Sequence, residues 1–358
     1  MKYVLLAAIL GGVVLWGLSD RAVEFFDARL EAAVREALGL ERGPIHRADL
    51  LCLSELTAVG REIAHLEGLE ACQNLVFLDF SENYVVDLSP LSGLTQLETL
   101  VLRSNRVEDV TPLAGLTNLR KLDLDFNFVK DVAPLAGLTK LRWLGLWNSG
   151  IRDVSPLSGL TELVELGLGG CPIEDPTPLS RLKKLEWLGL PNTGIEDVSA
   201  LSGLKNLIKL SLGGNRIIDL SPLQGLTGLE GLGLDSNRIV DIAPLAGLVG
   251  LRRLSLWGNE ISDIASLGGL TQLEELWLDR NPITDLGVLE QLTNLRVLGL
   301  SGTLVGEVQP LVGNRGLGKG DEVDLTGVPL DFVTDTAARG VIEALRGRGV
   351  DVHWSERP

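Results

Sequence analysis

Cysteine, histidine and methionine are scarce in this chain of 358 residues, which has three cysteines, three histidines and one methionine. His46, His65 and His353 are too scattered to suggest a shared metal site. No Cys-His or Ser-His-Asp grouping suited to nucleophilic catalysis can be defined. Free thiols are the expectation, although a Cys52–Cys72 pair stays open. The sequence therefore predicts a non-enzymatic protein without a cofactor.

Basic residues are in the minority, with 32 Lys and Arg against 48 Asp and Glu and a formal net charge of −16. Nucleic-acid binding needs a basic stripe to neutralise phosphates, and none is present. The nearest phosphate-loop pattern has Gly313, Gly318 and Lys319 at suitable spacing, but Gly320 stands where Ser or Thr would bind magnesium. We expect a glycine-rich turn there and no nucleic-acid partner.

What the sequence does contain is one pattern repeated every 22 residues. Each unit has the form Leu-x-x-Leu-x-Leu, and only Phe80 departs from it at the third leucine. Leu53 extends the register one unit earlier. The first leucines of the later units stand at 75, 97, 119, 141, 163, 185, 207, 229, 251, 273 and 295. A fixed period of this kind predicts stacked units that share one core.

The leucine spacing predicts a short strand in each unit, because successive strand residues point to opposite sides. In the stretch "LRRLSLWGNE", Leu254 and Leu256 should face the core. Ser255 and Trp257 should then face outward, on an open surface. A tryptophan at such a position requires a reason, because solvent favours a polar side chain there.

Asparagine follows the third leucine of seven units by three residues, at 83, 105, 127, 215, 237, 259 and 281. We expect its amide to bond to backbone groups of its own coil and the next, because a buried polar group left unpaired costs about 1–3 kcal/mol. In four units Ser149, Cys171, Thr193 and Thr303 take this place, and each keeps a donor.

An aspartate recurs in ten units, at 87, 109, 131, 153, 175, 197, 219, 241, 263 and 285. It precedes a Ser/Thr/Ala-Pro-Leu segment in most units. Aspartate in this place is typical of a residue that caps a helical turn started by proline. A calcium column is the alternative, but one carboxylate per unit falls short of the six to eight oxygen ligands that calcium takes.

The combined pattern L-x-x-L-x-L-x-x-N-x-I-x-D-[VLI]-x-P-L-x-G-L, over residues 50–312, resembles the 22-residue leucine-rich repeats of bacterial internalin-like proteins. Residues 25–40 resemble the helical N-terminal cap of that family, and the chain from Gly320 to Trp354 resembles its C-terminal cap. The resemblance implies an α/β fold: a right-handed leucine-rich-repeat solenoid. It would have a parallel concave β-sheet, 3₁₀ turns on the convex face, a helical N-terminal cap and an α/β C-terminal cap.

Four segments follow from these patterns. They are a signal peptide or membrane anchor at 1–19, a helical cap at 20–52, an array of about twelve repeats at 53–312, and a C-terminal cap at 313–358. The first segment begins with Lys2 and then has an uncharged run from Tyr3 to Ser19. A cleaved secretory signal and an uncleaved anchor spanning residues 3–18 both fit. Either one predicts export, with the repeats outside the cytoplasmic membrane and no other membrane contact.

The outward strand positions carry five of the seven tryptophans, with glycines between them. The tryptophans fall into two groups: Trp143, Trp147 and Trp187 in one, and Trp257 and Trp277 in the other. Aromatic anchors dominate interface hot spots, so this concentration predicts a binding surface. The predicted contact residues are Phe77, Arg103, Lys121, Trp143, Trp147, Glu165, Trp187, Lys209, Arg253, Trp257, Glu275 and Trp277.

Two explanations of the tryptophans stay open. They can contact a partner, or they can pack on each other and on long neighbours such as Arg253 and so stabilise the sheet. The sequence thus predicts a monomeric, exported recognition module that binds a protein on its concave face. A structural solenoid at the cell envelope, or a glycan bound on the Trp/Gly floor, are the alternatives.

Overall fold

The computed structural model describes residues 22–355. Within this range fourteen parallel strands form one sheet in sequence order. The strands are β1 (Glu55–Thr57), β2 (Phe77–Asp79), β3 (Thr99–Val101), β4 (Lys121–Asp123), β5 (Trp143–Gly145), β6 (Glu165–Gly167), β7 (Trp187–Gly189), β8 (Lys209–Ser211), β9 (Gly231–Gly233), β10 (Arg253–Ser255), β11 (Glu275–Trp277), β12 (Val297–Gly299), β13 (Glu322–Asp324) and β14 (Asp351–His353).

Helical turns connect the strands. The α-helices are α1 (Ala28–Leu38), α2 (Arg47–Leu50), α3 (Gln309–Gly313) and α4 (Thr336–Gly347). The 3₁₀ turns are η1 (Leu69–Ala71), η2 (Ser89–Leu91), η3 (Thr111–Leu113), η4 (Ala133–Gly137), η5 (Ser155–Gly159), η6 (Thr177–Arg181), η7 (Ser199–Leu201), η8 (Ser221–Leu223), η9 (Ala243–Leu245), η10 (Ala265–Gly269) and η11 (Gly287–Gln291). No helix within residues 22–355 is long and apolar enough to cross a membrane.

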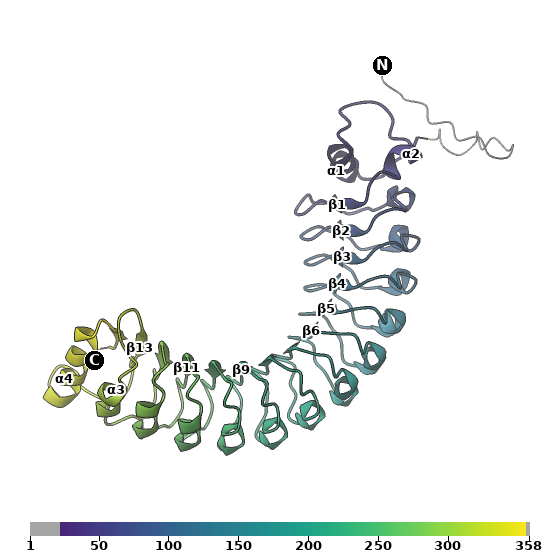
Figure 1. Ribbon diagram of the computed structural model, residues 1–358. Coiled ribbons are helices and arrows are strands. Elements are labelled where there is room, and N and C mark those ends of the chain that lie inside the picture. Colours follow the sequence, from purple (N-terminus) through teal and green to yellow (C-terminus); the bar gives the residue numbers. More distant parts are fainter. Residues whose placement is uncertain (1–21, 356–358) are drawn as a thin grey trace.

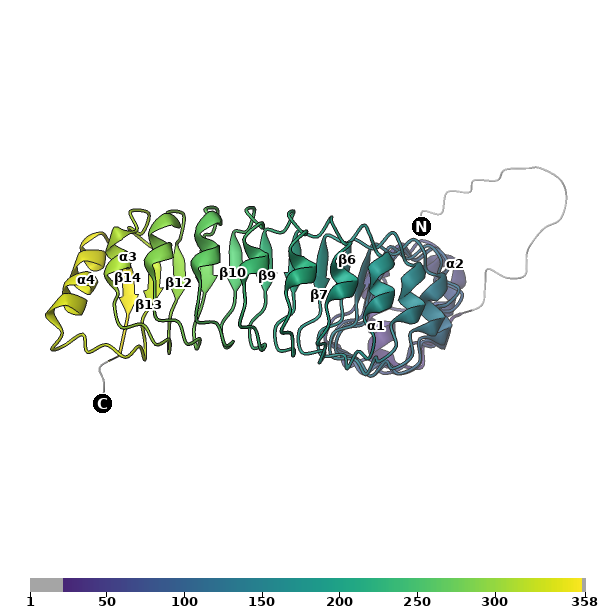
Figure 2. The ribbon, with the colours of Figure 1, turned by 90° about the horizontal axis from the view of Figure 1, so that it is seen from below.

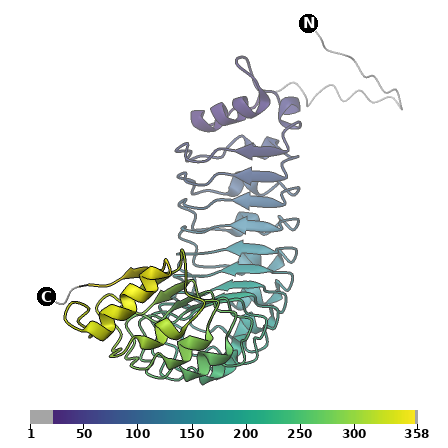
Figure 3. The same ribbon diagram turned by 60° about the vertical axis from the view of Figure 1, so that its left-hand side comes forward.

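The coils form a curved solenoid with the strands on its inner side and the 3₁₀ turns on its outer side (Figure 1). Coils β1 to β4 stack almost straight, and the chain then curves through β5 to β9. The strands of the straight part lie parallel, one above the other (Figure 3). From below, the coils follow one another toward α4 (Figure 2). The leucine-rich-repeat solenoid expected from the sequence is therefore confirmed.

The asparagines join neighbouring coils as expected, but they bond to the preceding coil and not to the next one. Asn259 donates from Nδ2 to the Leu256 carbonyl of its own coil at 2.8 Å and to the Leu234 carbonyl of the preceding coil at 3.0 Å. Its Oδ1 accepts from the Ile239 N–H at 3.1 Å, again in the preceding coil. The chain has already passed the strand when it reaches the asparagine, so the exposed backbone groups within reach belong to the coil before.

Three successive coils interrupt this ladder. Cys171 donates from Sγ to the Leu146 carbonyl at 3.1 Å, and Thr193 donates to the Leu190 carbonyl at 3.0 Å. Ser149 Oγ is buried with no hydrogen-bond partner among the described residues, so its donor is present but unused. These coils lie where the solenoid begins to curve (Figure 1).

The three cysteines are free thiols, as expected, and no Cys52–Cys72 disulfide forms. Cys72 is buried as a small apolar side chain, and its burial raises the pKa of the thiol to about 12. A thiol with such a pKa stays protonated at neutral pH and is a weak nucleophile.

All ten column aspartates accept a hydrogen bond from the backbone N–H two residues later, at 2.7–2.8 Å. That N–H belongs to the first residue of the ten 3₁₀ turns η2 to η11, so the aspartates bond the first amide of these turns as predicted. No group of three or more His, Cys, Asp or Glu side chains able to hold a metal ion occurs within residues 22–355.

The N-terminal end of the array is covered by α1. Asp27 caps this helix by accepting from the Arg29 N–H at 2.9 Å, and its second oxygen accepts from the Ala64 N–H of the first coil at 2.9 Å. Leu30 and Val34 on the helix are fully buried against the leucine core. One carboxylate therefore both starts the helix and fixes it to the array.

The C-terminal cap extends the sheet beyond the twelve coils expected from the sequence. Strands β13 and β14 continue it, and Val341 and Leu345 of α4 are buried in the core. Gly313 ends α3, and residues 314–321 form the predicted glycine-rich turn leading into β13. In it the Gly318 N–H donates to the Asp321 carboxylate at 2.8 Å. Asn314, at the C-terminal end of α3, donates from Nδ2 to the Leu289 and Leu292 carbonyls of the preceding coil at 2.7 and 3.0 Å.

Candidate recognition surface

The twelve predicted contact residues all lie on strands β2 to β11 or in the turns directly after them. The leucines that alternate with them are buried, so the contact residues project from the inner, concave side of the sheet. Their side chains differ in the groups that they contact. Two regions of this face, one over β5–β7 and one over β7–β11, have different surroundings.

The first region, which we call the tryptophan platform, consists of Trp143, Trp147 and Trp187 lying over glycines. A side chain at Gly145 would have its Cβ 2.6 Å from the Trp143 ring, and one at Gly189 would lie 2.7 Å from the Trp187 ring. Such distances are well inside van der Waals contact. The glycines are therefore needed to accommodate the rings.

Trp147 crosses to the neighbouring coils. Its ring lies over Gly167 and Gly169 of the next coil, where a Cβ at Gly169 would be 2.6 Å from ring atom Cε3. It also stacks on Trp187, with ring centroids 6.4 Å apart and an interplanar angle of 23°. Stacked aromatic pairs contribute about 0.5–1.5 kcal/mol beyond the area they bury. Mutual packing therefore accounts for part of this region.

Cations extend the platform on its N-terminal side. Lys121 Nζ lies 4.8 Å from the centroid of the Trp143 ring. Arg103 forms an ion pair with Asp125 at 3.1 Å, and Asp125 also accepts from the Trp147 N–H at 2.8 Å. Lys121 therefore packs on a ring of the platform, in the way that the structural explanation expected of long neighbours such as Arg253.

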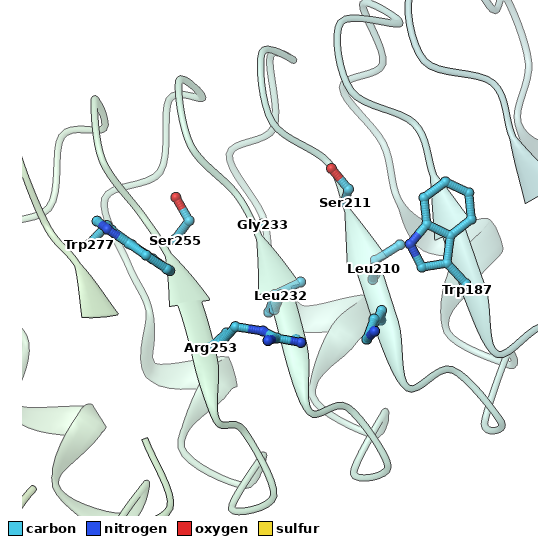
Figure 4. A pocket seen from close by; sticks show the side chains of 10 residues that line it. Trp187, Leu210, Ser211, Leu232, Gly233, Arg253, Ser255 and Trp277 are labelled. Carbon is cyan, nitrogen blue, oxygen red and sulfur yellow. The ribbon is translucent and has the colours of Figure 1, made fainter. Parts of the chain in front are cut away.

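The second region, which we call the open hollow, lies between Trp187 on β7 and Trp277 on β11 (Figure 4). It has a volume of about 210 Å³. Trp187 thus belongs to both regions, whereas the sequence grouped Trp277 with Trp257 alone. Trp257 lies in the turn beyond Ser255 and is 37% exposed.

The floor of the open hollow is bare backbone. A Cβ at Gly231 would be 3.5 Å from the nearest atom, and one at Gly233 would be 3.7 Å from its nearest atoms, which are ordinary contacts. No ring covers these glycines, in contrast to those of the tryptophan platform. The hollow can therefore admit a side chain or a ligand group.

Partly buried carboxylates border the concave face. Burial raises the pKa of Asp125, Asp235 and Asp279, and backbone N–H donors only partly offset this effect. Six column aspartates on the outer turns behave oppositely, because hydrogen bonds from the side chain and backbone of the residue two positions later lower their pKa. They are Asp87, Asp109, Asp153, Asp175, Asp197 and Asp219. The two sets differ because the outer turns are exposed and rich in donors, whereas the concave acids are partly removed from water.

An exposed phenylalanine that the sequence did not predict as a contact residue lies beside the platform. Phe126 is 42% exposed and has a φ of 57°, in the turn position where other coils have Gly, Asn, Ser, Glu or Arg. The Arg103 guanidinium lies 4.7 Å from the centroid of its ring. Left-handed backbone costs a residue with a Cβ about 1–2 kcal/mol. An aromatic residue in that column was the signal available in the sequence.

Comparisons with known proteins agree with this architecture. The family model described as Leucine Rich repeats (2 copies) matches residues 73–115, 95–137, 183–225, 205–247, 249–291 and 271–313. These matches cover more than half of the chain, which is a leucine-rich repeat protein. No curated protein matches it.

Among solved structures, the chain is similar to an internalin, InlF, from Listeria monocytogenes, with 32% identity and a TM-score of 0.86. The match covers 93% of this chain and 96% of InlF. The chain therefore belongs to the internalin-like leucine-rich repeat proteins.

Two more distant structures share the fold. The functional domain of InlJ from Listeria monocytogenes has 22% identity and a TM-score of 0.68, over 92% of this chain and 81% of InlJ. The Arabidopsis receptor kinase HAESA, solved with the peptide hormone IDA and a co-receptor, has 19% identity and a TM-score of 0.63, over 71% of this chain and 46% of HAESA.

Proposed function

We propose that this protein is a non-catalytic recognition module that binds a protein partner on its concave face. The observation that carries the proposal is the open hollow, where two tryptophans flank uncovered backbone at Gly231 and Gly233. Large aromatic side chains around a space that can be filled are typical of interface hot spots. The HAESA structure, which shares the fold, holds a peptide hormone, and this supports a protein ligand here.

We also propose that the protein is exported. The support is the sequence of residues 1–19, which lie outside the described residues: one lysine is followed by an uncharged, mostly apolar run. A reporter that is active only outside the cytoplasm, fused after residue 45, should give signal. Activity of a cytoplasm-specific reporter at the same position would contradict export.

The proposed binding can be tested by affinity capture from an envelope extract of the source organism. The bait would be the wild-type chain or a variant with Trp143→Ala, Trp187→Ala and Trp257→Ala. A matched control would carry Ile218→Ala and Val240→Ala, since these exposed apolar residues lie outside the strands. We expect the wild type and the control to retain one specific protein that the triple variant loses.

Folding must be measured in parallel, because the platform tryptophans also pack on glycines. Circular dichroism and the melting temperature would show whether the triple variant remains folded. If it is folded and still retains the same protein, the concave tryptophans are not the binding surface. If no bait retains a specific protein and the variant chiefly loses stability, the structural alternative is favoured, and the Trp147–Trp187 stack supports that alternative.

A further inference from the structure

The open hollow contains positive charge that the chain leaves unpaired. Lys209 and Arg253 line it, and the lining formed by the described residues includes no acid. Neither side chain forms an ion pair or a hydrogen bond with another described residue. Two cations without an ion pair therefore lie in one hollow of a chain whose formal net charge is −16.

Several basic residues elsewhere on the array are paired across coils. Arg252, the immediate neighbour of Arg253, forms an ion pair with Glu274. Arg152 pairs with Glu174 at 3.2 Å, and further pairs join Arg120 with Glu98, Lys184 with Glu162, and Arg216 with Glu196. Arg142, Arg238 and Arg296 are likewise without an ion pair among the described residues, but Lys209 and Arg253 are the two cations that line the hollow.

The strand register places the two cations two strands apart, on the same side of the hollow. Lys209, Gly231 and Arg253 are partners in register on β8, β9 and β10. With about 4.8 Å between strands, the two basic residues are roughly 10 Å apart at Cα, with a glycine between them. Arg253 extends over β9 (Figure 4), away from Glu275, its register partner on β11. The guanidinium thus points into the space above Gly231.

The surroundings favour a charged ligand group at this point. Trp187 and Trp277 border the hollow on two sides. A ligand lying between them would displace water, which strengthens a charge-assisted hydrogen bond. The Ser211 hydroxyl, also in the lining, can pair with a peptide group. Asp235 borders the floor near Gly233, so an anion is favoured on the side of Lys209 and Arg253 and disfavoured on the opposite side.

We infer that the open hollow binds a carboxylate of an acidic peptide segment, held by Lys209 and Arg253 between Trp187 and Trp277. This inference rests on the proposed function and names the chemistry of the partner segment. An acidic surface repels most anions, so an anion accepted only between these two cations would also fix where the partner docks.

The inference can be tested with blocked hexaglutamate as the probe and blocked hexaglutamine as the uncharged comparison, at about 0.15 M salt, where long-range repulsion is screened beyond about 8 Å. Binding would be measured by calorimetric titration of the full chain. We expect hexaglutamate to bind and hexaglutamine not to bind. Lys209→Gln and Arg253→Gln should each weaken hexaglutamate binding at least about tenfold, as expected for loss of a charge-assisted contact.

Two further variants make the result specific. Arg252→Gln removes the same charge one residue away, outside the hollow, and should leave hexaglutamate affinity unchanged within about twofold, because exposed charges interact weakly. Gly231→Leu fills the floor without a charge change and without a clash at Cβ, and it should abolish binding. Melting temperatures of all variants would establish that they are folded.

The inference would be overturned if hexaglutamate did not bind to the wild type, or if all variants bound it equally. It would also be overturned if tri-galacturonate bound in preference to hexaglutamate, because the ligand would then be an acidic glycan and not a peptide. The same variants used as capture baits separate this inference from the proposed function. If Lys209→Gln and Arg253→Gln retain a protein that the triple tryptophan variant loses, the concave face binds its partner elsewhere and only the carboxylate site is wrong.

Discussion

The tryptophan platform and the open hollow both combine tryptophans with glycines on outward positions of the sheet, yet they differ in what covers the glycines. At Gly167 and Gly169 the Trp147 ring occupies the space that a side chain would need, whereas Gly231 and Gly233 meet only ordinary contacts. The comparison teaches that a Trp-Gly pattern on a concave sheet can mean either internal packing or an available site. The direction in which each ring leans decides between them.

The comparison is tested most directly by one substitution made in both regions. Gly167→Ala should lower the free energy of unfolding by about 1–3 kcal/mol, because its Cβ would displace the Trp147 ring. Gly233→Ala should leave stability unchanged or raise it by up to about 1 kcal/mol, because the new methyl group fits and the unfolded chain loses freedom. Chemical denaturation of both variants would measure this, and equal effects would remove the distinction.

A tryptophan from each region gives the next largest difference. Trp147→Ala should lower the free energy of unfolding by about 2 kcal/mol. This is less than the loss expected for an aromatic residue in the core, because the Trp147 ring is half-buried on glycines and Trp187. Trp257→Ala should lower the free energy of unfolding by less than about 1 kcal/mol, because the Trp257 ring makes no aromatic contact with the described residues. Thermal unfolding would compare them. A larger loss for Trp257→Ala would show that the exposed ring has a structural role.

The interrupted ladder beneath the platform gives a stabilising change. Ser149→Asn should raise the free energy of unfolding by about 1 kcal/mol, because an amide there can reach the Leu124 and Leu146 carbonyls, as Asn127 reaches its equivalents. Urea denaturation would detect it. A destabilised variant would mean that the curved coils cannot accommodate the regular asparagine bridge.

The smallest expected effect is a pH dependence. Burial raises the folded-state pKa of Asp235 above its unfolded value of about 3.9, so ionisation opposes folding as pH rises through that raised pKa. Asp235→Asn should therefore be more stable than the wild type at pH 7, and the difference should vanish as pH falls toward 4. Melting temperatures from pH 3.5 to 7 would measure it.

Asp219 provides the control of opposite sign. Hydrogen bonds from Ser221 lower the folded-state pKa of Asp219. Asp219 therefore stabilises the folded protein above its unfolded-state pKa, and this stabilisation is lost as pH falls through the folded-state pKa. Asp219→Ala should be less stable than the wild type at pH 7 and converge with it in acid. If both variants shift in the same direction with pH, the contrast between the concave and outer acids is incorrect.

The sequence predicted the solenoid, the outward strand positions and the capping aspartates, because each follows from a period that local backbone geometry enforces. It placed all twelve contact residues on one face but could not separate packed rings from free ones. It also paired Trp257 with Trp277, whereas Trp187 and Trp277 enclose the hollow. The exposed Phe126 was missed because its turn belongs to no leucine column.

By itself the sequence determined which side chains leave the leucine core, since alternation along a strand leaves each residue only two directions. Only the tertiary structure decided where those side chains come to rest. Ring direction across coils, the free floor at Gly231 and the unpaired state of Lys209 and Arg253 depend on contacts between residues one or more coils apart. Such contacts are set by the curvature and stacking of the whole array, which no single repeat encodes.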